Sequence, residues 1–327
     1  MTLSTRTAAA ALTVFIPGLI AVAQAQSQPY PNRPIQIAVG LAPGSIMDSA
    51  ARIVSKKGSQ LLGLPLVIEN KPGAGTMIAS SYVAKAKPDG YTLLLNGVAL
   101  SVNPSLYKEV PYDAAHDFTP VAFLVNAPQI LAIHPSLGVT TLGEFFAKYK
   151  GSDNLNYASP GAGTMPHLAA ELFRSRSGIK MNHVPYKGGA PALTDLIAGH
   201  VHLLFLTPVA KTQIDSGAVR ALAVAAEERV ESVPNIPTFA ESGFPLPEIN
   251  AGTWIGILAP RGAADSIVRK LNQTFNAVLQ DAGVREELKR IGLVPKAMTP
   301  EEFAAFMRDD MKKWPPIIAA AGISAQQ

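Results

Sequence analysis

The residues best suited to chemistry lie at turns rich in glycine and proline. The turn at 40–48 reads GLAPGSIMD and contains the pattern S-x-x-D, Ser45 to Asp48. This pattern predicts a helix that begins directly after the turn. Gly44 lets a backbone approach closely, and the free N–H groups and dipole of a helix start can bind an anion. The alternative is that Ser45 only caps a helix.

A second turn sequence occurs twice. The hexapeptide PGAGTM stands at 72–77 and again at 160–165, each time between a strand-like run and a helical one. Thr76 and Thr164 are the expected helix N-caps, and His167 follows in the first turn of the later helix. Two facing helix starts of this kind could hold an anion between them. The alternative is that both copies of the hexapeptide are ordinary turns that bind no ligand. A fourth turn, VPYKGGAP at 184–191, offers Lys187, which we interpret as a solvated loop lysine.

No arrangement of residues predicts catalysis or a bound metal. The chain lacks G-x-S-x-G, H-E-x-x-H and G-x-x-x-x-G-K-[ST]. His200 and His202 are spaced i, i+2 between a helix end and a strand start, which favours solvated histidines over metal ligands. Acidic residues occur singly in the turns, so no general acid–base pair emerges. We therefore predict no catalytic residue, no metal site and no cofactor.

The first 25 residues have the layout of a secretory signal peptide. One basic residue, Arg6, precedes an apolar run at 8–23, and Ala23-Gln24-Ala25 forms a small-x-small exit. We expect cleavage near Ala25 and export, with no membrane span in the product. Cysteine is absent, which excludes disulfides and thiol chemistry. The formal net charge is +4, but the Lys and Arg residues form no cluster along the sequence. We therefore expect no nucleic-acid partner.

The remaining sequence alternates strands with helices. Strand candidates are 35–39, 66–69, 91–95, 121–125, 130–133, 156–158, 183–185, 202–206, 219–225 and 253–259. Helix candidates are 48–62, 76–85, 165–175, 191–199, 209–216, 264–281, 284–291 and 300–314. This alternation predicts α/β layers with mostly parallel sheets. Two extended crossings, near 126–129 and at 253, predict a first lobe of 26–125 plus 253–327, a second lobe of 126–252, and a hinge with a ligand cleft.

Several segments together strongly resemble the Bug-type substrate-binding proteins of tripartite tricarboxylate transporters. They include YPNRPIQIAVGLAPGSIMDSAAR, VIENKPGAGTMIASSYVAKAKPDGYTLLLNG, NYASPGAGTMPHLAAELF, VPYKGGAPALTDLIAGHV and WIGILAP, in family order from about Tyr30 to Trp314. The resemblance implies a type II periplasmic binding-protein fold, with two α/β lobes joined by a two-segment hinge. It also implies a periplasmic location, membrane subunits of a tripartite carrier as partners, and capture of a small carboxylate.

The resemblance further implies that the carboxylate is captured between two loops, which by position are a first binding loop, residues 42–48, and a second binding loop, residues 159–167. The expected ligand contacts lie in these two loops and at the end of a later strand. They are Ala42, Pro43, Gly44, Ser45, Met47, Asp48, Ser159, Gly161, Ala162, Gly163, Thr164 and His167 in the loops, and Leu206 and Thr207 at the strand end. A receptor that feeds a membrane sensor kinase is one rival function. An enzyme on the same two-lobed fold is another, although the pyrrole-polymerising enzyme of related plan needs a cysteine that this chain lacks.

The chain departs from the family pattern at three places. Ser45 replaces the second glycine of the usual Pro-Gly-Gly, and Gly75-Thr76 stands where Gly-Gly is common. Leu206-Thr207 stands where many members carry Asp-Asn. Because Leu206 offers no acceptor for an ammonium group, we expect an amine-free ligand, either an aliphatic di- or tricarboxylate or an aromatic acid. An apolar or aromatic body of the ligand is favoured by Leu206, Met47 and Met165 near the expected pocket.

Overall fold

The computed structural model describes residues 30–161, 163–186, 188–250 and 252–323. The signal peptide predicted for residues 1–25 and the predicted contact Ala162 therefore lie outside the described residues, as does Lys187. Residues 31–327 form one compact unit. The predicted lobe boundaries at 125/126 and 252/253 stay predictions, and the following description concerns this unit alone.

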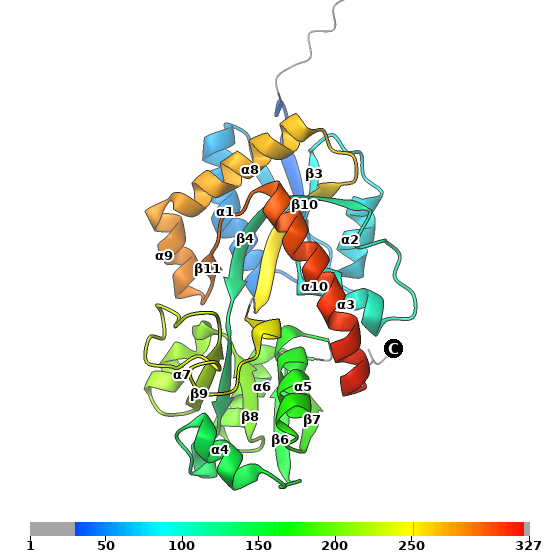
Figure 1. Ribbon diagram of the computed structural model, residues 1–327. Helices are drawn as coiled ribbons and strands as arrows, with labels where there is room; N and C mark the ends of the chain where they lie inside the picture. Colours follow the sequence, from blue (N-terminus) through cyan, green and yellow to red (C-terminus); the bar gives the residue numbers. More distant parts are fainter. Residues whose placement is uncertain (1–29, 162, 187, 251, 324–327) are drawn as a thin grey trace, which may run out of the picture. The chain divides into compact units, whose positions relative to one another are not determined.

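Six strands of the described residues form a first sheet with the order β11-β4-β10-β3-β1-β2 (Figure 1). Its strands are β1 (Ile35–Val39), β2 (Leu66–Asn70), β3 (Thr92–Gly97), β4 (Phe118–Ala127), β10 (Thr253–Pro260) and β11 (Val294–Pro295). Strands β1, β2 and β3 are parallel, while β10 runs antiparallel to both β3 and β4. Its helices are α1 (Ile46–Leu62), α2 (Met77–Ala84), α3 (Val98–Leu106), α8 (Asp265–Gln280), α9 (Ala282–Arg290) and α10 (Pro300–Ala321).

Five further strands form a second sheet with the order β7-β6-β8-β5-β9. They are β5 (Gln129–Ile133), β6 (Leu155–Ser159), β7 (Met181–Pro185), β8 (Leu203–Leu206) and β9 (Arg220–Ala225). Strands β6, β7 and β8 are parallel, and β5 is antiparallel to β8. The associated helices are α4 (Leu142–Tyr149), α5 (Met165–Ser177), α6 (Gly189–Ile197) and α7 (Lys211–Asp215), with a 3-10 turn η3 (Pro208–Ala210) after β8. The predicted α/β class is confirmed.

Only Pro128 separates β4 of the first sheet from β5 of the second. The chain returns from the second sheet to the first just before β10. There it packs tightly against the connection between β4 and β5, because a Cβ on Gly252 would lie 2.0 Å from the carbonyl oxygen of Ala127. Gly252 also has a φ of +57°, which favours glycine. A side chain is therefore excluded at the point where the second crossing begins.

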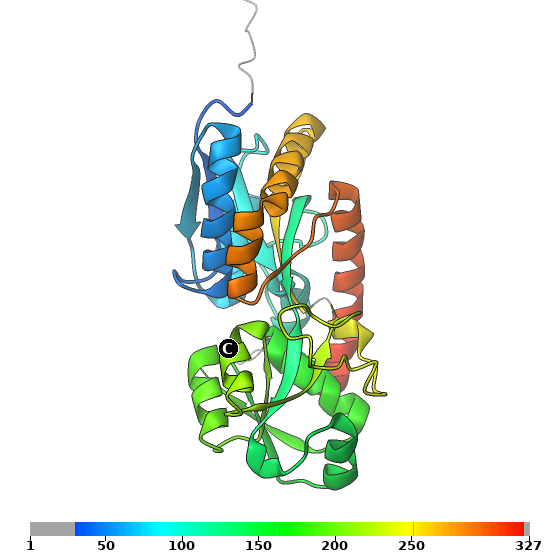
Figure 2. The ribbon, with the colours of Figure 1, turned by 90° about the vertical axis from the view of Figure 1, so that its left-hand side faces the viewer.

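Helix α10 extends beyond the end that the sequence predicts. The sequence predicts that it ends at Trp314, yet the helix continues through Pro315 and Pro316 to Ala321. Trp314 and Ile318 are buried on either side of the prolines, and the indole groups of Trp254 and Trp314 both donate to Asp310. Tertiary packing therefore outweighs the loss of the two backbone donors. The helix packs against α3 and β4 of the first sheet and against α5 of the second (Figures 1 and 2).

Candidate functional site

The strand directions bring the two predicted binding loops to facing ends of the sheets. β4 runs into the crossing and is parallel to β1, so the carboxyl end of β1 points toward the second sheet. β5 leaves the crossing and is antiparallel to β6 and β8, so the carboxyl ends of these two strands point back toward the first sheet. The first loop follows β1, the second loop follows β6, and Thr207 follows β8.

The same topology collects helix starts at these ends. α1 begins after β1, α3 after β3, α5 after β6 and α6 after β7. The first N–H groups of each helix have no acceptor within the helix, and the helix dipole adds partial positive charge there. The facing ends of the two sheets therefore offer backbone donors for an anion without needing a basic side chain.

The first binding loop is held by Asp48. Ser45 is the N-cap of α1, and its hydroxyl accepts from the Asp48 N–H at 3.2 Å, as the S-x-x-D pattern predicts. The Asp48 carboxylate in turn accepts from the Gly44 N–H, from Arg52 Nε and from Asn70 Nδ2, each at 2.9 Å. Burial of Asp48 favours its neutral form, but these donors outweigh it and hold the pKa of the carboxyl below its ordinary value.

This arrangement separates the residues of the first loop into two groups. Ala42, Pro43 and Gly44 are exposed and Ser45 is half-buried, so all four can face a ligand. Asp48 is 2% exposed and has its acceptors occupied, and Met47 is 5% exposed. Asp48 therefore fixes the loop. Met47 is buried in the protein core, and its predicted contact with the ligand stays a prediction.

The second binding loop is also held by acceptors within the protein. Gly161 donates its N–H to Ser159 Oγ at 3.2 Å, and Gly163 donates its N–H to His167 Nδ1 at 3.0 Å. Ser159 and His167 are buried, whereas Gly161, Gly163 and Thr164 are half-buried. Two glycine N–H groups of this loop are thus already engaged, and the helix start of α5 beyond Thr164 supplies the remaining donors.

The prediction that hydroxyl groups cap α2 and α5 is wrong. Thr76 and Thr164 occupy the N-cap positions, but neither side chain accepts from its helix. Thr164 Oγ1 instead donates to the Gly161 carbonyl at 2.7 Å, and Thr76 Oγ1 accepts from Asn96 at 3.1 Å. The loop geometry, including a left-handed φ of +75° at Thr76, turns these hydroxyls away from the helix N–H groups.

Three stacked rings that the sequence does not reveal lie behind the second loop. His167 and His183 stack with centroids 4.0 Å apart, and Tyr157 stacks on His183 at 4.9 Å. His183 Nε2 lies 2.6 Å from Ser159 Oγ, and the Tyr157 hydroxyl hydrogen-bonds with Glu171. The two imidazoles thus hold both ends of the loop, one through Ser159 and one through Gly163.

Burial favours the neutral form of both imidazoles in this stack. It lowers the pKa of His167 to about 3, and the charges of His183 and Arg174 act in the same direction. Burial also lowers the pKa of His183, although the Glu171 carboxylate opposes that shift. A neutral His167 can accept from the Gly163 N–H, whereas a protonated ring has no acceptor left. Retention of the loop geometry therefore requires the neutral form of His167.

Leu206 and Thr207 stand where β8 ends. Leu206 is 8% exposed and pairs with Ile130 of β5, and it packs in an apolar cluster with Ala210 and Val219. Thr207 is half-buried. Of the two, Thr207 is the more exposed, and both stay predicted ligand contacts.

The chain is similar to a known family of proteins. Residues 50–323 match the model of the tripartite tricarboxylate transporter family receptor. The chain belongs to this family. The receptor is 34% identical to the protein BugT of Bordetella pertussis over 317 residues, which cover 96% of this chain and 97% of BugT.

The solved structure of the periplasmic binding protein BugD confirms the predicted fold, since it is 32% identical, covers 91% of this chain and 100% of its own, and has a TM-score of 0.76. A protein from R. palustris solved with adipate is 32% identical, covers 91% of this chain and 100% of its own, and has a TM-score of 0.78. MatC from Rhodopseudomonas palustris, solved with bound malate, is 31% identical, covers 88% of this chain and 100% of its own, and has a TM-score of 0.74.

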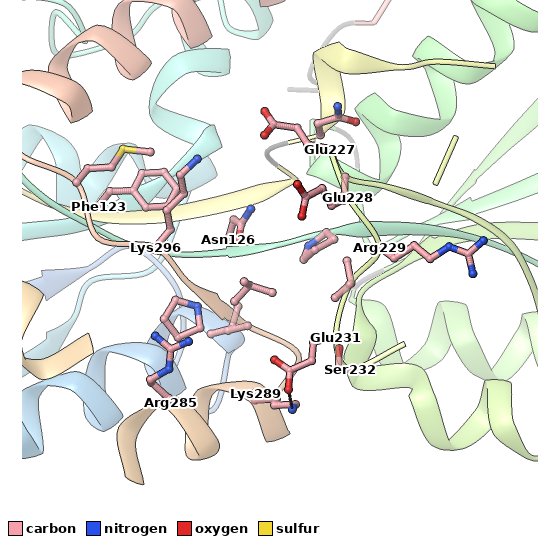
Figure 3. A pocket seen from close by; sticks show the side chains of 18 of the residues that line it. Phe123, Asn126, Glu227, Glu228, Arg229, Glu231, Ser232, Arg285, Lys289 and Lys296 are labelled. Atoms are coloured by element: carbon pink, nitrogen blue, oxygen red, sulfur yellow. Dashed lines mark hydrogen bonds and ion pairs between the residues drawn. The ribbon is translucent and has the colours of Figure 1, made fainter. Parts of the chain in front are cut away.

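A cavity among the described residues lies away from the predicted binding loops. It has a volume of about 780 Å³ and is lined by β4, the segment after β9, α9, β11 and α10 (Figure 3). None of the described residues that are predicted to contact the ligand lines this cavity. We call it the hinge cavity, because residues of the crossing, Asn126 and Pro128, form part of its wall.

The described residues contain no helix long and apolar enough to cross a membrane and no group of three or more residues arranged to hold a metal ion. The paired histidines of the sequence have other partners. His202 Nδ1 accepts from the Asn156 N–H at 2.9 Å, and His200 lies 3.3 Å from Asp195.

The ring stack predicts a measurable pH dependence of stability. An ordinary histidine has a pKa of about 6.5 in the unfolded chain, whereas that of His167 in the folded receptor is about 3. The unfolded state therefore binds more protons between these values, and folding stability falls as the pH falls through this window.

In His167→Asn the amide oxygen can still accept from Gly163, but this titration is lost. We expect the slope of the unfolding free energy against pH to decrease by up to about 1.4 kcal/mol per pH unit between about pH 6 and pH 4. Urea unfolding at a series of pH values measures this slope. His116→Asn, at an exposed position, is the control, and an equal slope in wild type and His167→Asn would contradict the assignment.

Proposed function

We propose that the protein is the extracytoplasmic solute-binding receptor of a tripartite tricarboxylate-type carrier and that it holds a small, amine-free carboxylate between its two binding loops. The first loop contributes Ala42, Pro43, Gly44 and Ser45, and the second contributes Gly161, Gly163 and Thr164, with Thr207 beside them. Five buried residues position these loops from the protein interior, namely Ser159, His167, Met47, Asp48 and Leu206. Ala162 belongs to the proposed second loop by its place in the sequence.

The observation that carries this proposal is the convergence of helix starts at the facing ends of the two sheets. Such starts stabilise a carboxylate through backbone N–H groups and the helix dipole. Relatives at 31–32% identity have been solved with adipate and with malate, which are dicarboxylates without an amine. A dicarboxylate suits two loops that face each other, because each loop can bind one end.

The chemistry of the loops supports an amine-free ligand. An ammonium group requires an acceptor, and burying it without one is costly. The carboxylate in the first loop, Asp48, already accepts from Gly44, Arg52 and Asn70. Leu206 offers only an apolar side chain at the position where an acidic residue would bind an ammonium.

Closure of the two loops on the ligand would create the surface that the membrane subunits of the carrier recognise. In this proposal the receptor works outside the cytoplasm and catalyses no reaction. Its task is capture and delivery, and the free energy of binding drives the population of the closed form.

A ligand screen tests the substrate class. A ligand that binds only the folded state raises the melting temperature. We expect an amine-free acid from a panel of adipate, malate, citrate, phthalate and nicotinate to raise the melting temperature of the processed protein. Aspartate and glutamate, in the same panel, should leave it unchanged. Stabilisation by the two amino acids alone would contradict the proposal.

Substitution of Gly163 tests whether the second binding loop contacts the ligand. It has a φ of +75°, and a Cβ there would lie 2.5 Å from Leu106 Cδ1 at the end of α3. Because Leu106 belongs to α3, on the first-sheet side, the added methyl group requires the Leu106 side chain to shift where the two sides meet. We expect Gly163→Ala to weaken binding of the acid that the screen identifies by about tenfold or more, measured by isothermal titration calorimetry.

Gly178 at the other end of α5 supplies the matched control. Its φ is +70° and nothing lies within 4 Å of a Cβ there. Gly178→Ala therefore carries the same left-handed strain of about 1–2 kcal/mol without the contact, and should bind normally. Adding Leu106→Ala to Gly163→Ala should restore part of the affinity. Unchanged affinity in Gly163→Ala would remove this loop from the site.

A further inference from the structure

Charge is divided unequally between the two walls of the hinge cavity. Arg285 and Lys289 of α9 and Lys296 after β11 line the wall on the first-sheet side (Figure 3). Glu227, Glu228 and Glu231, in the segment after β9, line the wall on the second-sheet side. We call these the basic wall and the acidic wall.

Two further charged residues line the cavity without changing this division. Arg229 belongs to the acidic segment, but its guanidinium turns away from the cavity and pairs with Glu241 at 2.9 Å (Figure 3). Glu286 is the acid on the basic wall.

One ion pair already joins the walls. Lys289 Nζ lies 2.7 Å from Glu231 Oε1, and the two residues are 58 positions apart in the sequence. The contact with Lys289, and more weakly the charge of Arg285, lowers the pKa of Glu231. Attraction between the walls is therefore present in the described arrangement.

The strand orders place the hinge cavity and the binding loops on opposite sides of the crossing. In the first sheet β11 lies on one side of β4, whereas β10, β3 and β1 lie on the other. In the second sheet β9 lies on one side of β5, whereas β8 and β6 lie on the other. The cavity is lined by β11 and the segment after β9, and the binding loops follow β1 and β6.

Rotation about a crossing of this kind narrows one side while it widens the other. Attraction between opposite charges increases as they approach, so the two walls favour a narrow hinge cavity. A narrow hinge cavity means that the binding loops are apart.

We propose that the basic and acidic walls of the hinge cavity hold the receptor in the form with its binding loops apart, and so set carboxylate affinity from outside the ligand site. This regulation rests on the proposed function only in that closure of the loops accompanies binding. Each exposed charge contributes little, and the device acts through the sum of several charges that face one another across the hinge.

A distance measurement without ligand tests the device. The chain has no cysteine, so spin labels attached in Lys56→Cys and Ala198→Cys report on two chosen positions alone. Both positions are exposed, one on α1 and one at the end of α6. These helices begin on the side of the binding loops, so the distance between the labels follows the separation of the loops.

The triple variant Glu227→Gln, Glu228→Gln, Glu231→Gln removes the acidic wall. We expect the label distance distribution to shift toward shorter values, with the ratio of open to closed molecules falling about two- to fivefold for each interaction lost. At 1 M salt the Debye length is about 3 Å, so wild type and the triple variant should then give the same distribution.

Glu286→Gln makes the same chemical change on the basic wall and should not shorten the distance, because it strengthens the attraction. Lys57→Gln breaks the 2.6 Å pair with Asp281, which lies wholly on the first-sheet side, and should leave the distance unchanged. Melting temperatures of all variants confirm folding.

An unchanged or longer distance in the triple variant would overturn the proposal, as would shortening by Glu286→Gln to the same extent. Because no ligand is present, a failed ligand screen leaves this test intact. A failure of this test likewise leaves carboxylate binding intact.

Discussion

The site depends on one constraint, the crossing at Pro128. A single residue between β4 and β5 leaves the chain no room to reverse, so the second sheet begins where the first ends. Strands parallel to β4 then point their carboxyl ends toward the second sheet, and strands antiparallel to β5 point theirs back. In an α/β fold each carboxyl end leads into a helix start. The crossing thereby brings the positive N-terminal ends of several helices together, whichever side chains the binding loops carry.

Internal hydrogen bonds fix the loops at these helix starts. In the first loop a carboxylate, Asp48, accepts from Gly44 and holds the turn against Arg52 and Asn70. In the second loop the acceptors are neutral. His167 Nδ1 accepts from the Gly163 N–H, and Ser159 Oγ accepts from the Gly161 N–H. A loop that is already ordered loses less conformational entropy on binding. The side chains nearest the proposed ligand therefore act mainly by shaping backbone donors.

Local signals explain what the sequence predicted well. The S-x-x-D pattern located the start of α1 because a cap acts over three residues, and the β-branched runs located buried strands such as β1 and β6. Long-range contacts explain what was missed. Tyr157 and His183 are 26 positions apart, and nothing near either residue indicates that their rings stack. Likewise α10 passes Pro315 because of contacts with Trp254, far away in the chain. Thr164 was named correctly as a cap position, but the direction of its hydroxyl depends on the glycine geometry of the whole loop.

The central claim is that a carboxylate lies between the starts of α1 and α5. A crystal structure of the receptor with the acid that most raises its melting temperature tests this claim most directly. The account predicts carboxylate oxygens within hydrogen-bond distance of backbone N–H groups in residues 42–48 and 159–167. Density for the acid in the hinge cavity, with both loops empty, would contradict it.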